Sequence, residues 1–280
     1  MKWNPAHYRI IMVVTYIFSC IKIKTKPCKY FQLNSPWFNL EKGVFSKFDL
    51  NAMFPEQWRL DIDNLQDEFQ PNQYPVWLKP EWGENADGVY CALDEVEYQQ
   101  IKNEVLQANR PYLVQKSATG EREFEIFLLW ESSESMQPAT FSITEAKNDE
   151  ERRPVNGIYN PHTSYYDLTD QLDHDQQSKI RKYMESIGRF PISRLCVRTE
   201  NIEEFTKGHF QIVEINLFTP MPIHLLDSRY TNRERWLMIR KLTMSLAKAT
   251  RNRNPTLKEK PVYTRMIQNH IRYRFTSLAK

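Results

Sequence analysis

Two polar side chains interrupt an apolar run in the last third of the chain. In QIVEINLFTPMP, residues 211–222, Glu214 and Asn216 stand among isoleucine, valine and leucine. If this run is a strand, residues two apart share one face, so Ile212, Glu214 and Asn216 are neighbours. A carboxylate and an amide oxygen placed in this way can converge on one hard cation. A strand end that emerges into solvent before Thr219 explains the same residues, so the pattern alone leaves both interpretations open.

The length and composition predict a folded globular protein. The chain has 280 residues, 41% hydrophobic and 13% aromatic, which is enough to bury the core of one large or two modest domains. The net charge of +3 is unevenly distributed. Residues 1–30 hold six basic and no acidic residues, and residues 229–280 hold fourteen basic and two acidic residues. Both ends of the chain are therefore basic, and the middle is acidic.

The cysteine pattern gives little support for a structural metal site. The four cysteines, at positions 20, 28, 91 and 196, lack CxxC spacing, and no histidine follows them at zinc-finger spacing. Four cysteines can form two disulfides, but in a chain of this length we expect reduced thiols and a cytoplasmic protein.

The most apolar window of the sequence lies near the N-terminus. Its uninterrupted part, Ile10–Ile21, is shorter than the roughly 20 residues that a membrane-spanning helix needs, so we expect a buried or interfacial helix. Lys22, Lys24, Lys26 and Lys29 follow, an arrangement that suits an anionic membrane surface, although solvated lysines beside a core helix need no membrane. The basic C-terminal tail carries no recognised nucleic-acid motif, so we do not expect nucleic acid as a partner.

The remaining patterns predict an α+β fold of mixed hairpins and helices. Ser46 is the expected N-cap of a helix that ends near Met53, before Pro55. Strands are expected over Val76–Lys79, Gly88–Ala92, Tyr112–Gln115, Glu123–Trp130, Ser193–Arg198 and His209–Asn216, with the third and fourth paired through Thr119-Gly120. Further helices are expected over Asp94–Ala108, Leu168–Ile187, Asn232–Lys248 and Tyr263–Tyr273, and a polar, irregular loop over Ser132–Tyr166.

Three motifs occur in a familiar order: YPVWLKPEWGENADGV, LVQKSATGEREFEIFLL and FQIVEINLFTPMPIHLL. Together they resemble the ATP-grasp superfamily of carboxylate–amine ligases, and most closely its D-alanine–D-alanine ligase-like branch. The resemblance covers about residues 46–249 and implies two α+β lobes with a nucleotide cleft between them. It divides the chain into an apolar and basic segment (1–45), an ATP-grasp domain (46–250) and a basic tail (251–280). Within the domain, the small lobe is expected over about 75–131 and the large lobe over about 132–250.

The resemblance implies which residues bind ATP. Lys47 and Lys79 match the two lysines that contact the phosphates, and the segment from Gly83 to Gly88 matches the loop that closes over them. Three further residues match the pocket for the nucleoside, namely Gln115 and Lys116 at the adenine and Glu123 at the ribose.

The resemblance also implies a reaction and a metal. Such ligases phosphorylate a carboxylate with ATP, and an amine then displaces the phosphate, so the expected cofactors are ATP and magnesium. The expected partners are small-molecule or peptide carboxylates and amines. Arg194 matches an arginine that steadies the acyl substrate and its oxyanion, and Glu214 and Asn216 match two magnesium ligands. Lysines and magnesium suit this chemistry because charge develops on the phosphoryl group during its transfer.

Each of these residues also has an ordinary structural explanation. Lys79 can be an edge-strand lysine whose stem lies along apolar surface. Glu123 can pair with Arg122 or Lys116 as a surface carboxylate. Lys47 can be a helix surface charge, and Arg194 can pair with any of the acids in the middle of the chain.

The sequence departs from the family pattern at several positions. Cys196 stands where the family has an aspartate that binds magnesium, and a thiol is a soft ligand ill matched to magnesium. Glu84 and Asp87 lie in the phosphate loop, where they would oppose a polyanion unless they face solvent. Gln115 replaces a glutamate, and only some 45 residues precede Lys47, where superfamily ligases carry a further α/β domain. A degenerate protein that binds nucleotide or a partner without ligating is therefore the alternative.

Overall fold

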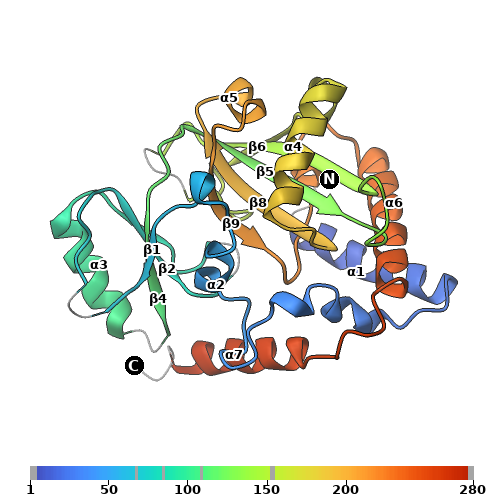
Figure 1. The fold of residues 1–280 in the computed structure, drawn as a ribbon, viewed down its shortest axis with the longest axis horizontal. Helices are drawn as coiled ribbons and strands as arrows, with labels where there is room; N and C mark the ends of the chain where they lie inside the picture. Colours follow the sequence, from blue (N-terminus) through green and yellow to red (C-terminus); the bar gives the residue numbers. More distant parts are fainter. Residues whose placement is uncertain (1–4, 67–68, 84–85, 108–109, 152–154, 277–280) are drawn as a thin grey trace.

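The computed structural model describes residues 5–66, 69–83, 86–107, 110–151 and 155–276, and its centre is a pair of antiparallel sheets (Figure 1). The smaller sheet has the order β1-β4-β2-β3, with β1 (Ile62–Asn64), β2 (Val76–Pro80), β3 (Tyr90–Ala92) and β4 (Tyr112–Lys116). The larger sheet has the order β7-β6-β5-β8-β9, with β5 (Arg122–Leu129), β6 (Thr140–Lys147), β7 (Ser164–Asp167), β8 (Ile192–Thr199) and β9 (Gln211–Asn216). The sheets form the cores of two α+β lobes.

Helices cover one face of the smaller sheet and parts of both faces of the larger sheet. The α-helices are α1 (Pro5–Lys22), α2 (Lys47–Asn51), α3 (Glu95–Gln107), α4 (His174–Ile187), α5 (Ile202–Thr206), α6 (Asn232–Arg251) and α7 (Val262–Thr276). Short 3₁₀ helices lie between them, namely η1 (Pro27–Gln32), η2 (Ser35–Trp37), η3 (Glu56–Trp58), η4 (Thr169–Gln171) and η5 (Ile223–Leu226).

In the smaller lobe, one sheet face is apolar and the other is polar. Leu78 and Val114 pack with Tyr98 and Val105 of α3 in one buried cluster. Because side chains alternate along a strand, the residues next to them, including Lys79, point to the opposite face. This polar face is turned toward the larger sheet.

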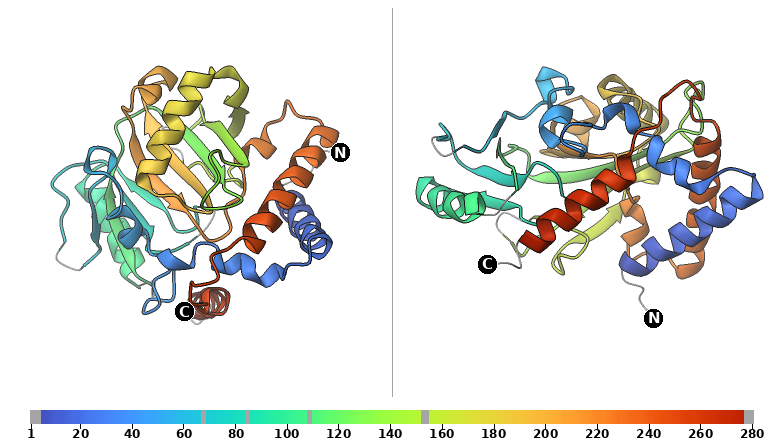
Figure 2. Two further views of the ribbon diagram at one scale, coloured as in Figure 1. Left: turned by 45° about the vertical axis from the view of Figure 1, so that its right-hand side comes forward. Right: turned by 90° about the horizontal axis from the view of Figure 1, so that it is seen from below.

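Successive side chains of the larger sheet also point to opposite faces, and the two faces have different surroundings. Phe124 and Ile126 of β5 belong to the main core with Ile180 and Met184 of α4. On the other face, Phe127 packs in a second cluster with residues of α1 and α6, which lie side by side at this end of the sheet (Figure 2). Glu123 and Glu125 share the face of Phe127 but lie toward the smaller lobe, so this face is apolar at one end and charged at the other.

The first helix lies against α6 with part of its surface buried. Tyr16 and Cys20 are buried against α6, and the Tyr16 hydroxyl lies 2.9 Å from Thr250 Oγ1. None of the helices in the described part of the chain has the length and apolar character needed to cross a membrane.

Most of the expected elements are confirmed. Ser46 caps α2 by accepting a hydrogen bond from the Asp49 backbone N–H at 3.2 Å. The expected strands at Val76, Ser193 and His209 correspond to β2, β8 and β9, and the expected helices correspond to α3, α4, α6 and α7. The mixed α+β class is therefore correct, because strong local patterns fix these elements.

Two expectations are wrong, and both concern pairing between distant segments. The expected hairpin of Tyr112–Gln115 with Glu123–Trp130 does not form, because β4 pairs with β1 and β2 while β5 pairs with β6 and β8. The turn expected at Thr119-Gly120 is instead part of the crossing between the sheets. The expected loop Ser132–Tyr166 contains β6 and most of β7, and the polar residues Ser142, Thr144 and Glu145 of β6 are buried.

The crossing between the sheets predicts a stability difference between two glycine variants. A Cβ atom at Gly120 would lie 2.3 Å from the Thr199 backbone N, so Gly120→Ala must displace backbone. We expect it to lower the free energy of unfolding by about 1–3 kcal/mol. At Gly83 the nearest atom to an added Cβ is a Pro80 side-chain carbon at 3.7 Å, an ordinary contact, so Gly83→Ala serves as the control.

Urea unfolding followed by circular dichroism measures both changes. Equal unfolding free energies for Gly120→Ala and the parent chain would contradict the close approach of the crossing segment to β8.

Candidate functional site

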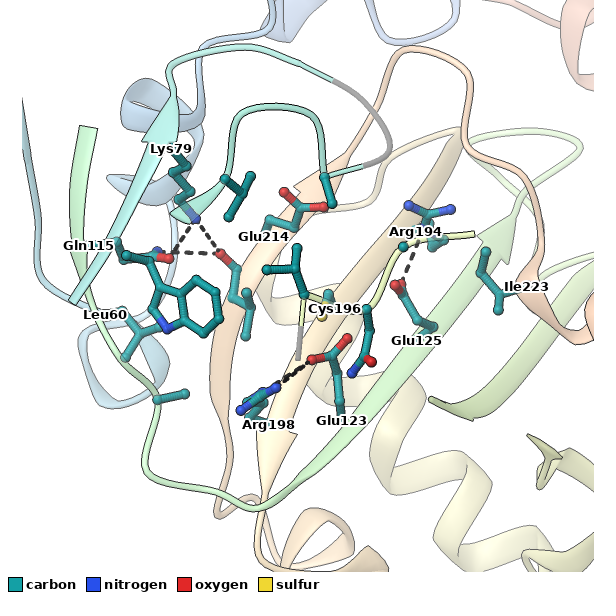
Figure 3. A pocket seen from close by; sticks show the side chains of 18 of the residues that line it. Leu60, Lys79, Gln115, Glu123, Glu125, Arg194, Cys196, Arg198, Glu214 and Ile223 are labelled. Atoms are coloured by element: carbon teal, nitrogen blue, oxygen red, sulfur yellow. Dashed lines mark hydrogen bonds and ion pairs between the residues drawn. The ribbon is translucent and has the colours of Figure 1, made fainter. Parts of the chain in front are cut away.

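A cavity lies where the polar face of the smaller sheet meets the charged end of the larger sheet (Figure 3). Both sheets line it, with Lys79, Gln115 and Lys116 from the smaller sheet and Glu123, Glu125, Arg194, Cys196, Arg198 and Glu214 from the larger sheet. Its volume is about 120 Å³, whereas pockets for small molecules measure roughly 300–1,000 Å³. The cavity is therefore smaller than a usual small-molecule pocket.

Lys79 is the central cation of this cavity. It is 4% exposed, and its ammonium donates hydrogen bonds to Gln115 Oε1 at 2.5 Å and to the Val213 carbonyl at 3.1 Å. The second bond joins the two lobes. Burial lowers the pKa of Lys79 to about 8, and the Glu214 carboxylate only partly opposes this shift. The edge-strand alternative for Lys79 is wrong, because its head group is buried rather than solvated.

Lys47 approaches the same region from the first turn of α2. Its ammonium donates a hydrogen bond to the Gly83 carbonyl at 3.4 Å, and a small adjoining cavity is lined by Lys47, Lys79 and Glu214 together. Burial raises the pKa of Glu214, but Lys47, Lys79 and Arg194 outweigh it, so the net shift is downward. The two lysines expected at the phosphates and the carboxylate expected at magnesium are thus neighbours.

A row of three side chains crosses the larger sheet at the cavity. Glu125 of β5 pairs with Cys196 of β8, and Cys196 pairs with Glu214 of β9. Burial raises the pKa of Glu125 to about 7 and raises that of the Cys196 thiol well above its usual value. The thiol, which stands where a magnesium-binding aspartate was expected, therefore has a carboxylate on either side.

A register shift in β9 corrects one part of the strand interpretation. Ile212 pairs with Val197 and Glu214 with Cys196, so Val213 is an extra residue in β9. Ile212 consequently points into the core at 0% exposure, and the prediction that it shares a face with Glu214 and Asn216 is wrong. A bulge of this kind redirects the side chains on either side of it.

Asn216 and Arg194 lie one pair further along the strands. They are directly opposite each other, and Asn216 Oδ1 accepts a hydrogen bond from the Phe218 backbone N–H at 3.2 Å. Arg194 Nε lies 3.2 Å from Glu125 Oε2 (Figure 3). Arg194 is therefore held between the carboxylate of β5 and the end of β9.

Glu123 has a different partner from those expected. Its carboxylate accepts hydrogen bonds from Arg198 Nε at 3.1 Å and Nη2 at 3.0 Å, while Arg122 pairs with Glu145 at 2.6 Å. Burial raises the pKa of Glu123, and Arg198 opposes the shift. Lys116 lines the cavity without being the partner of Glu123 in any of these bonds.

Part of the segment expected to close over the phosphates lies beside the cavity. Ala86 and Val89 line the cavity, while Asp87 is exposed and pairs with Arg110 at 3.3 Å. Gly88 has φ +69°, a backbone conformation that L side chains rarely adopt, so this position favours glycine. Gly83 carries no such constraint, and Glu84 lies outside the described residues. Asp87 therefore faces solvent beside Arg110 and is not among the residues that line the cavity.

Two charged residues of the cavity escaped the sequence analysis, Glu125 and Arg198. The signal that could have found them is the two-residue repeat of side chains on one face of a strand. Glu125 is two residues after Glu123 in EREFEIF, and Arg198 follows Arg194 and Cys196 at two-residue steps in SRLCVR. Only the pairing of β5 with β8 shows that Glu123 lies opposite Arg198 and that Glu125 lies opposite Cys196.

The cavity offers carboxylate oxygens that a hard divalent cation could use, and Glu125 is one of their sources. Ligand atoms of Glu123, Glu125 and Cys196 lie within 4.8 Å of one another, and Glu125 Oε2 is buried without a hydrogen-bond partner, although Arg194 is close. Carboxylate and amide oxygens suit magnesium and a thiol does not. Glu125, Glu214 and Asn216 therefore provide the ligand types that magnesium prefers.

Comparison with known proteins bears on the fold. No protein-family model matches the chain, and neither does any curated protein. Among solved structures, D-alanine–D-alanine ligase from Bacillus anthracis aligns with TM-score 0.51 and 14% identity over 74% of this chain and 68% of the ligase. The VanG D-Ala:D-Ser ligase from Enterococcus faecalis aligns with TM-score 0.50 and 11% identity over 79% of this chain and 70% of the ligase.

The alignments with these ligases cover only part of each chain and have low sequence identity. The B. anthracis ligase complexed with ATP aligns at TM-score 0.49 and 13% identity over 74% of this chain. The chain spans 66% of that ligase's length, slightly under two thirds. At these identities the likeness concerns the backbone arrangement, which both ligases with TM-scores of at least 0.50 share. The chain therefore has an α+β fold of the ATP-grasp type, which it shares with these two ligases.

Proposed function

We propose that the protein is an ATP- and magnesium-dependent ligase that joins a carboxylate to an amine through an acyl phosphate. The observation that carries this proposal is the meeting of Lys47, Lys79 and Glu214 at one cavity between the lobes of an ATP-grasp fold. Two cations beside a carboxylate suit a triphosphate with its metal, because phosphoryl transfer needs fixed positive charge in a site that excludes water.

The residues of the cavity divide the work of such a reaction. Lys47 and Lys79 would bind the phosphates, and Gln115, Lys116 and Glu123 would hold the nucleoside. A carboxylate oxygen of the acyl substrate attacks the γ-phosphorus of ATP, and ADP leaves. The amine nitrogen then attacks the acyl carbon, phosphate leaves, and the nitrogen loses a proton. Arg194 would stabilise the oxyanion formed in the second step.

Magnesium, when bound, would neutralise charge on the phosphates during transfer, and Glu125, Glu214 and Asn216 would hold it. Glu125 takes this role in place of residue 196, because it lies directly across from Cys196 and carries the carboxylate that Cys196 lacks. Its ion pair with Arg194 would have to loosen as the metal binds.

The closed cavity supports an opening step before catalysis. Lys79 and Gln115 both donate to the Val213 carbonyl, at 3.1 and 3.3 Å, and the same two residues would be needed at the phosphates and the adenine. ATP would therefore replace these two hydrogen bonds. The ammonium of Lys79 would exchange a protein partner for a phosphate and would not have to be desolvated at that moment.

A second candidate function is nucleotide binding without ligation. Cys196 favours it, because a buried thiol with a raised pKa stays neutral and offers magnesium little. The two candidates differ in product formation. Incubation with ATP, magnesium and mixtures of amino acids, followed by mass spectrometry, should yield ADP and an amide in equal amounts if the protein is a ligase.

A matched variant makes this test specific. Lys79→Met should abolish product formation, while Lys179→Met, on the exposed face of α4, should leave it unchanged. Nucleotide binding without any product would favour the second candidate, and the absence of both would contradict both.

The pKa of Lys79 predicts how nucleotide affinity depends on pH. Because this pKa is about 8, the free protein holds a growing fraction of neutral Lys79 as the pH rises above 8. The phosphates need the ammonium, so binding takes up a proton, and affinity should fall by up to about tenfold per pH unit. Calorimetry in buffers of different ionisation enthalpy measures both effects.

The control for this dependence is Lys79→Arg, whose guanidinium stays charged. Its nucleotide affinity should vary little between pH 7 and pH 9.5. Equal pH dependence in the parent chain and in Lys79→Arg would show that Lys79 does not contact the phosphates.

Two substitutions should change metal affinity in opposite directions. Cys196→Asp should raise the affinity for Mg²⁺ and Mn²⁺, and Glu125→Gln should lower it, each by at least about tenfold. If Glu125 acts in place of an aspartate at position 196, the double variant should recover the parent affinity. Electron paramagnetic resonance of Mn²⁺ at pH 8, where Glu125 is ionised, gives these affinities without any turnover.

Glu121→Gln, in the exposed turn before β5, is the control for the metal experiment. Unchanged Mn²⁺ affinity in Glu125→Gln would remove Glu125 from the metal site, and unchanged affinity in Cys196→Asp would place the metal away from β8.

A further inference from the structure

The exposed surface of α1 (Pro5–Lys22) is apolar from Ile10 to Ile21. Six large side chains are exposed by 40–66%, namely Ile10, Val13, Val14, Ile17, Phe18 and Ile21. They recur at three- and four-residue intervals, which places them on one face of the helix. Scattered exposed hydrophobic residues are common on proteins, but a continuous stripe of six marks an interaction surface.

The orientation of this stripe is fixed by the rest of the fold. On its other side α1 buries Tyr16 and Cys20 against α6, and the Tyr16 hydroxyl donates to the Pro27 carbonyl at 3.0 Å. Exposure of Phe18 at 66% is therefore a property of the folded protein, since turning the helix would expose the tyrosine and cysteine instead. In Figure 1 and Figure 2, α1 and α6 lie at the end of the molecule away from α3.

Positive charge follows the stripe directly. Lys22, Lys24 and Lys26 are exposed at the C-terminal end of α1 and in the turn after it. Residues 5–30 contain no acidic residue. The neighbouring helix α6 adds the exposed apolar residues Trp236 and Leu237, together with the exposed basic residues Arg233, Arg240 and Lys241.

We propose that α1 lies in the interfacial region of an anionic membrane, with its apolar stripe among the acyl chains and the lysines at the headgroups. An amphipathic helix with a basic border has the composition that binds such surfaces. The alternative occupant, a second copy of the same stripe, would offer these lysines no carboxylate from α1, because residues 5–30 contain no acidic residue. The charge favours lipid.

This orientation would leave the cavity between the lobes accessible. Helix α1 lies at the opposite end of the molecule from α3 of the smaller lobe, so a membrane at α1 would not cover that lobe (Figure 1). The proposal concerns recruitment to a surface and does not depend on whether the protein is a ligase.

Vesicle flotation of the full chain tests the apolar part of the proposal. Binding to vesicles of equal phosphatidylglycerol and phosphatidylcholine should be at least tenfold stronger than binding to phosphatidylcholine alone. The double variant Ile17→Glu with Phe18→Glu should bind at least tenfold more weakly, since both side chains are exposed and the fold does not need them. Met136→Glu, at a residue 88% exposed elsewhere, is the matched control and should bind like the parent chain.

A second set of variants tests the charged part. Replacing Lys22, Lys24 and Lys26 with glutamine should reduce binding at least tenfold and weaken its dependence on salt. The same replacement of Lys179, Lys182 and Lys207 removes equal charge elsewhere and should have little effect. Thermal melts show that each variant is folded.

Three results would overturn the proposal. One is the absence of vesicle binding at low salt, and another is equal binding by the parent chain and the Ile17→Glu, Phe18→Glu variant. The third is a dimer in sedimentation velocity that this variant abolishes, because the stripe would then be covered by a second copy of the chain.

Discussion

Burial of the Lys79 ammonium between two sheets is the constraint on which the rest of the site depends. A buried charge is stable only if its hydrogen bonds are satisfied, and Lys79 obtains them from Gln115 in its own lobe and from Val213 in the other. The bond to Val213 needs a main-chain carbonyl turned toward the cavity, and the extra residue in β9 is at that position. The bulge, the contact between the lobes and the lowered pKa of Lys79 are thus linked.

The strands of the larger sheet place apolar side chains in the core on one face and charged side chains at the cavity on the other. Along β5, Phe124 and Ile126 fill the main core, while Glu123 and Glu125 face the cavity on the other side. Such carboxylates are tolerated because Arg198 and Arg194 stand across from them or next to them on β8. These ion pairs hold the cavity side chains in place while leaving groups that a ligand can recruit.

The sequence predicted the elements that depend on local pattern. The N-cap at Ser46 and the ordered motifs around Lys79, Glu123 and Glu214 were sufficient for the fold class and for the ATP-grasp resemblance. They were also sufficient to identify Lys79 and Glu214 as residues of one cavity, although their roles in binding remain predictions.

What could not be predicted depends on contacts between distant segments. The partner of Glu123 is Arg198, 75 residues away, and the role of Glu125 beside Cys196 appears only when β5 and β8 are paired. The bulge at Val213 is similarly invisible, because a strand pattern gives no sign of an extra residue until its partner strand is known. Polar strands such as β6 were missed because their burial comes from neighbouring segments rather than from their own composition.

The most direct measurement is a crystal structure of the protein with magnesium and a non-hydrolysable ATP analogue. The account predicts that the triphosphate lies between Lys47 and Lys79, with the metal against Glu214, and that the hydrogen bond from Lys79 to the Val213 carbonyl is replaced by one to phosphate. A nucleotide bound elsewhere, or a metal that contacts neither Glu214 nor Glu125, would contradict it.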